Sequence, residues 1–114
     1  MDNKHDKVLE AARQLAAEIA TSGACRDRDL ALANIEKDAD KMARLHEYKR
    51  LSRALQINRL KGITPTFDEE ASLSLLYSRL CVTPDCKAYL DASAQIDDML
   101  LGVYEILNSS IKYP

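Results

Sequence analysis

Apolar residues recur at three- and four-residue steps along most of the chain, the spacing that aligns side chains on one face of an α-helix. Near the start, this spacing predicts a helix from about residue 4 to 21. Its apolar stripe consists of Val8, Ala12, Leu15, Ala16 and Ile19. Ser22-Gly23 follows, where we expect glycine to take the left-handed conformation that ends many helices. A second, shorter helix is expected around residues 30–35.

The longest uninterrupted helical pattern covers residues 39–61, which contain neither glycine nor proline. Asp38 can accept hydrogen bonds from the free amides at its start, and whether the chain breaks or only kinks there stays open. Gly62 is expected to end the helix. The apolar stripe of this segment consists of Met42, Leu45, Tyr48, Leu51 and Leu55.

Two further helices are predicted after residue 62. Thr66 and Glu69 are three residues apart and can cap each other's free amides, so a helix is expected over 67–80. The last helix is expected from about 84 to 111, with apolar residues at steps of three and four. Such a seam usually packs against another helix, and we predict an oligomer seam here. It consists of Tyr89, Ile96, Leu100, Val103 and Leu107.

These elements predict an all-α fold with no sheet: a small bundle of about four to five helices with a long helical hairpin arm. The 114 residues fit one domain, expected to span 1–114. A composition of 46% hydrophobic and 30% charged residues, with three glycines and three prolines, favours helices. Long helices in so small a chain leave apolar surface exposed, and a second copy is a natural way to bury it.

The first twenty residues carry several charges, so they resemble neither a signal peptide nor a membrane span, and a cytoplasmic location is expected. The three cysteines cannot all pair internally, and free thiols are expected. No phosphate-binding glycine loop and no nucleophile with a base partner is present, so no enzymatic activity and no cofactor are predicted.

The segment CVTPDC places Cys81 and Cys86 around a possible helix start. Thr83 suits the N-cap position and Pro84 the first helical position, which explains the segment without a ligand. The alternative is a metal or cluster site using Cys81 and Cys86, which only Cys25 and the two histidines could complete. The helix dipole could also lower the pKa of the Cys86 thiol and make it reactive.

The charge pattern is uneven along the chain. Residues 41–61, the basic segment, hold seven basic residues against one acid, while the remainder carries a balance of −8. Three interpretations stay open: a solvated face paired with the acidic remainder, a docking surface for an acidic protein, or an RNA contact, the last disfavoured by the negative overall charge. The residues predicted to bind a partner are Lys49, Arg50, Arg53 and Arg59.

The order of these elements resembles the YlbF/YheA/YmcA family of small helical bacterial regulatory proteins. The resemblance rests on the opening helix VLEAARQLAAEIATS, an Asp before the long helix, the closing RLKG, the helix PTFDEEASLSLLYSRL and the last helix with Tyr89-Leu90 near its start. It spans nearly the whole chain.

The resemblance implies a self-associating, non-enzymatic adaptor or regulatory subunit. Members of the YlbF and YmcA type act with a YaaT protein on the endonuclease RNase Y and so affect mRNA maturation, competence, sporulation and biofilm formation. Their complex is associated with iron-sulfur clusters, which the resemblance could carry here only to Cys81 and Cys86. The expected partners are a second copy or related helical subunits, and a YaaT-like protein and RNase Y, without a membrane and without direct nucleic-acid binding.

Overall fold

The computed structural model describes residues 4–111, which form five helices and no strand. The helices are α1 (Asp6–Ala20), α2 (Gly23–Ile35), α3 (Ala39–Leu60), α4 (Phe67–Cys81) and α5 (Pro84–Ile111). The predicted all-α fold is confirmed, and the boundaries of the long helices fall within two residues of those expected. None of the helices in this part of the chain is long and apolar enough to cross a bilayer.

Local capping sets most of the helix ends. The Asp38 carboxylate accepts hydrogen bonds from the amides of Asp40 and Lys41, so the chain breaks there and does not merely kink. Thr66 and Glu69 form the predicted reciprocal capping box at the start of α4.

Of the two glycines predicted to end helices, Gly62 does so and Gly23 does not. Gly62 has φ +81°, and the amide of Ile63 reaches the carbonyl of Asn58 at 2.8 Å, the bond pattern of a left-handed helix C-terminus. The same expectation for Gly23 is wrong, because Gly23 has no positive φ and is the first residue of α2. The Ser22 hydroxyl accepts a bond from the amide of Cys25 and caps α2 instead. The second helix therefore begins earlier than the apolar pattern suggested.

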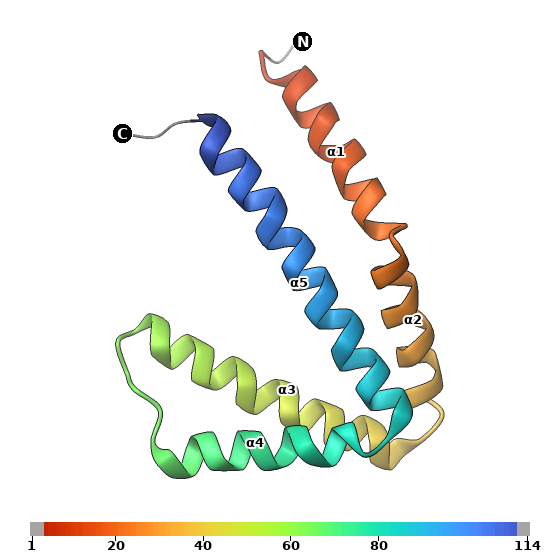
Figure 1. The fold of residues 1–114 in the computed structure, drawn as a ribbon, viewed down its shortest axis with the longest axis vertical. Helices are drawn as coiled ribbons and strands as arrows, with labels where there is room; N and C mark the ends of the chain where they lie inside the picture. The colour runs from red at the N-terminus through yellow and green to blue at the C-terminus, as the bar shows by residue number, and fades with distance from the viewer. Residues whose placement is uncertain (1–3, 112–114) are drawn as a thin grey trace.

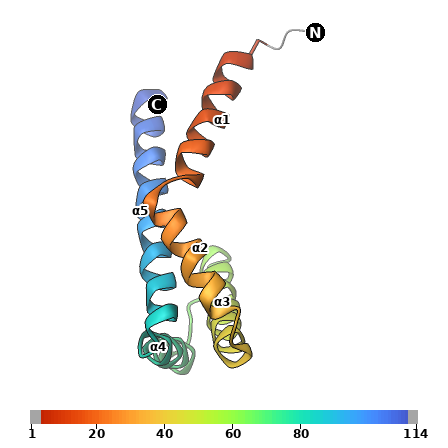
Figure 2. The same ribbon diagram turned by 90° about the vertical axis from the view of Figure 1, so that its right-hand side faces the viewer.

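The helices form two arms that meet at one end (Figure 1). α3 and α4 pack side by side as the hairpin arm, and α2 packs along the first half of α5. Figure 2 shows α1 continuing beyond α2 and leaning away from the far half of α5. The molecule is extended, with a radius of gyration of 17.9 Å against about 13 Å for a compact domain of this length.

The core lies where α2, α3, α4 and α5 meet. Tyr48 and Cys81 are partly buried against it. Its buried members are Ala31, Ile35, Leu45, Leu80, Cys86, Tyr89 and Leu90. No residue of α1 is buried, so α1 and the far half of α5, residues 97–111, extend beyond the core; together we call them the open stem.

Candidate partner-binding surfaces

The predicted oligomer seam divides into two parts along α5. Tyr89 and Ile96 are buried at 7% and 8% exposure, in the half of α5 that packs against α2. Leu100 and Leu107 are exposed, and Val103 is half-buried. The first part of the seam is therefore core within one copy, whereas the second part belongs to the open stem.

The open stem carries an apolar surface from two helices. On α1, Val8, Leu9 and Leu15 are exposed although they lie on or beside the apolar stripe predicted for that helix. On α5 the exposed apolar residues continue to the last turn. They are Leu100, Leu101, Tyr104, Ile106, Leu107 and Ile111. An isolated helix of 15 residues is marginally stable in water, so α1 needs a packing partner for its apolar face.

The total exposed surface is large for a chain of this size. The structure exposes 8875 Å², whereas a compact monomer of this length exposes about 6,300 Å². The excess is on the order of 2,000 Å², which is comparable to the surface that one subunit buries in an obligate homodimer.

Three of the four residues predicted to bind a partner lie together. Lys49, Arg50 and Arg53 line a groove on α3 with an accessible volume of about 500 Å³. The remaining lining residues are His46, Ala54 and Ile57, and we call the six the basic groove. Their spacing of three, four, seven, eight and eleven residues from His46 places them on one side of α3, and the same spacing could have identified them from sequence.

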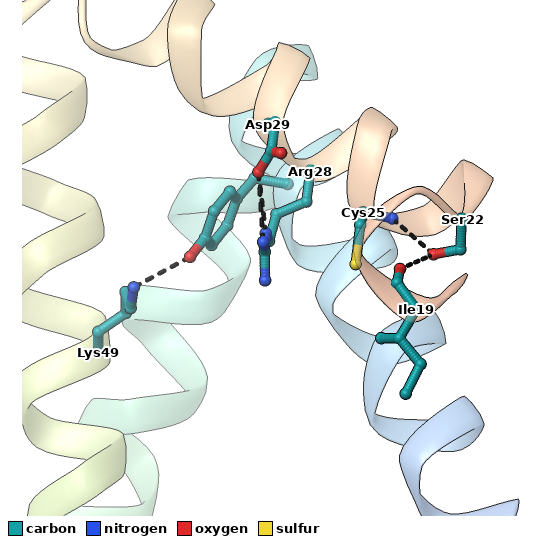
Figure 3. Close-up of polar contacts among 7 residues, drawn as sticks. Ile19, Ser22, Cys25, Arg28, Asp29 and Lys49 are labelled. Atoms are coloured by element: carbon teal, nitrogen blue, oxygen red, sulfur yellow. Dashed lines mark hydrogen bonds and ion pairs between the residues drawn. The ribbon is translucent and has the colours of Figure 1, made fainter. Parts of the chain in front are cut away.

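The groove cations differ in how they are held. Lys49 Nζ donates to the hydroxyl of Tyr89 at 2.9 Å and lies 5.4 Å from the centre of its ring, so α5 fixes its position (Figure 3). Arg50 and Arg53 form no ion pair within residues 4–111. Both guanidinium groups are therefore available to a partner.

Two other cations of the basic segment, Arg59 and Lys41, form ion pairs inside the molecule. Arg59, predicted to bind a partner, lies outside the groove and pairs with Glu70 of α4 at 3.4 Å. Lys41 pairs with Asp85 at the start of α5, also at 3.4 Å. The interpretation as a face paired with the acidic remainder therefore fits Lys41 and Arg59 but not Arg50 and Arg53.

The two cysteines of CVTPDC lie at the junction of α4 and α5. Cys86 is buried at 1% exposure, and burial raises the pKa of its thiol, opposite to the effect expected from the helix dipole. Cys81 is half-buried, and its hydrogen bond with the Tyr77 hydroxyl is the main cause of a raised Tyr77 pKa. Within residues 4–111, no three His, Cys, Asp or Glu side chains are grouped to hold a metal ion.

Within residues 4–111, the open apolar stem and the basic groove are both surfaces to which another molecule can bind. A family model described as control of competence regulator ComK, YlbF/YmcA, matches residues 8–112, and the chain belongs to this family. It is also similar to a UPF0342 protein of Caldicellulosiruptor bescii, with 27% identity over 106 residues that cover 93% of this chain and 89% of the relative. No solved structure matches it significantly.

Proposed function

We propose that this protein is a non-enzymatic helical adaptor that self-associates through the open stem and presents the hairpin arm to a protein partner. Membership of a family described by competence control supports a regulatory role. By the same resemblance, the partners are related helical subunits, a YaaT-like protein and RNase Y, and the consequence is altered mRNA processing.

The observation that carries this proposal is the unpacked open stem. Its exposed apolar side chains continue from residue 100 to residue 111, and α1 has no buried residue of its own. Burying apolar surface contributes roughly 25 cal/mol per Å², so covering these exposed apolar side chains favours association. A second copy offers the same two apolar helices and therefore a matching surface.

The test is the mass of the purified full chain in solution. Leu15 and Leu107 are 39% and 51% exposed, so Leu15→Asp with Leu107→Asp buries no charge in a single copy. We expect the wild-type chain to be a dimer or larger and this double variant to be a folded monomer by light scattering. In capture experiments with purified YaaT-like protein and RNase Y, we expect binding by the wild type and weaker binding by the variant.

The matched control places the same change outside the open stem. Leu60→Asp with Val82→Asp alters two apolar residues that are 88% and 83% exposed and should leave the mass unchanged. A wild-type chain that is monomeric at micromolar concentration, or a control that dissociates equally, contradicts the proposal.

A further inference from the structure

The far half of α5 in the open stem has an acidic side as well as an apolar one. Leu101 is 55% exposed and lies on the side of α5 opposite to Ile96 and Val103, given the 100° turn per residue. Asp97 and Glu105 lie four residues before and after Leu101, on its side of the helix. The outer side of the stem is therefore acidic, with one leucine at its centre.

This acidic side forms no ion pair in the part of its own copy that the structure describes. Residues 88–111 contain four acids and no base. Within residues 4–111, none of Asp97, Asp98 and Glu105 forms an ion pair. Figure 1 shows the far half of α5 extending away from the hairpin arm, which carries the basic groove.

The basic groove has the complementary pattern. Arg50 and Arg53 line it together with Ala54 and Ile57, and Ile57 is 44% exposed. The groove thus has arginines without an ion pair beside a small apolar surface. The outer side of the stem has carboxylates without an ion pair beside one exposed leucine. Both features extend over nine residues, from Lys49 to Ile57 and from Asp97 to Glu105, and the eight steps between their ends span about 12 Å of helix.

We propose that the acidic outer side of the stem, Asp97, Leu101 and Glu105, docks onto the basic groove of a second copy. Leu101 contacts Ala54 and Ile57, and the carboxylates face Arg50 and Arg53. The contact rests on the proposed self-association and adds to it, because Leu101 lies about 100° around α5 from Leu100 and about 120° from Leu107, on a different side of the helix. A twofold axis relating two copies forms two such contacts at once, one in each direction.

The two kinds of association differ in their response to salt. Exposed charge pairs are screened over about 10 Å at 0.1 M salt and about 3 Å at 1 M, whereas apolar contacts persist at high salt. We therefore expect the full chain to have a larger mass at low salt than at 1 M. The smaller species at high salt is the one held by the apolar stripe alone.

Charge reversal tests which residues make the contact. Arg50→Glu with Arg53→Glu, and separately Asp97→Lys with Glu105→Lys, should each give only the smaller species at low salt. An equimolar mixture of the two variants should recover the larger species, since each reversed surface then meets its opposite charge on the other chain. Arg26→Glu with Lys37→Glu changes the net charge by as much as Arg50→Glu with Arg53→Glu but lies outside both surfaces. This control should behave as the wild type.

Several outcomes would overturn the proposal. A wild-type mass of two copies at every salt concentration contradicts the charged contact and leaves the apolar self-association intact. A monomer at every salt concentration contradicts both. Reversed variants that keep the larger mass, or a mixture that fails to recover it, exclude these residues. A groove that binds single-stranded RNA, with masses that do not change with salt, shows that its occupant is not a second copy.

Discussion

Cys86 shows how burial competes with the field of a helix at the scale of one residue. It lies in the first turn of α5, where the helix dipole favours a thiolate. The side chain is almost fully buried among core residues, and the loss of hydration disfavours the charged form more strongly. Its pKa is consequently raised, and the thiol acts as a small apolar core residue.

Stability at alkaline pH should report this raised pKa. The Cys86 thiol has the ordinary pKa of 9.0 in the unfolded chain and a higher pKa in the folded chain. Above about pH 9 the unfolded chain therefore loses a proton that the folded chain keeps. The free energy of unfolding should therefore fall as the pH rises above about 9, and Cys86→Ala should reduce this fall. Urea unfolding of both proteins at several pH values, each referred to its own stability near pH 7, measures the difference. An identical fall in the variant contradicts the assignment.

Tyr89 joins the two arms of the molecule through one side chain. Its ring is part of the core, while its hydroxyl accepts the hydrogen bond from Lys49 of α3. The sequence alone placed both residues in predicted sites, Tyr89 in the seam and Lys49 among the partner-binding cations. Their contact joins residues 40 positions apart and depends on how α3 meets α5, which no local pattern specifies.

At the scale of the helix, the two remaining glycines have opposite roles. Gly62 has a positive φ that other residues adopt with strain, whereas Gly102 lies inside α5 with ordinary helical geometry. A Cβ atom added at either position meets no atom within 4 Å. Any effect of substitution in a single copy is therefore an effect on the backbone.

Replacing Gly62 and Gly102 by alanine should change the free energy of unfolding in opposite directions. Gly62→Ala should destabilise the folded chain by about 1 kcal/mol, because alanine resists the left-handed conformation. Gly102→Ala should stabilise it by about 0.5 to 1 kcal/mol, because alanine loses less entropy in a helix. Thermal unfolding of the Leu15→Asp, Leu107→Asp background keeps association out of the comparison. If both substitutions changed the stability in the same direction, backbone conformation would not be the main cause of their effects.

The helices were predictable because their signals are local. Asp38, Gly62 and the Thr66–Glu69 pair each act within a few residues, and each has the predicted role. Gly23 misled the prediction because a glycine after a helix also fits the first position of a new helix that Ser22 caps. The apolar pattern of α2 is weak near its start, so it did not indicate that a helix begins at Gly23.

The candidate sites were only partly predictable. Helical spacing groups Lys49, Arg50 and Arg53 correctly and places Arg59 on a different side, although net charge alone joins all four. For α5, the regular seam does not reveal that Ile96 packs within one copy while Leu107 stays exposed. That division depends on where α2 ends its contact with α5, which is a property of the tertiary fold.

At the scale of the whole molecule, the extended shape and the large exposed surface have one cause. The core occupies only the junction of the two arms, and the open stem extends beyond it (Figure 1). A compact chain of the same length would fold α1 back over the core. Here α1 makes its main contact with α2 alone, so its apolar stripe remains open.

Association should therefore appear in thermal stability. If copies bind through the open stem only when folded, the midpoint of unfolding should rise with protein concentration, by about 2 to 5 °C per tenfold increase. The Leu15→Asp, Leu107→Asp variant should show a midpoint that is independent of concentration. Differential scanning fluorimetry over a hundredfold range, at high salt, measures both. A constant midpoint for the wild type argues against stabilisation by a second copy.

The turn between α3 and α4 offers an experimental opportunity. It lies at the free end of the hairpin arm, and Ile63 is 52% exposed there (Figure 1). Exposed loop tips of this kind commonly accept inserted sequence. A fluorescent domain placed between Thr64 and Pro65 keeps Gly62 and the Thr66 cap in place. Such a fusion would let this protein be followed in living cells while the ends of its stem remain unmodified.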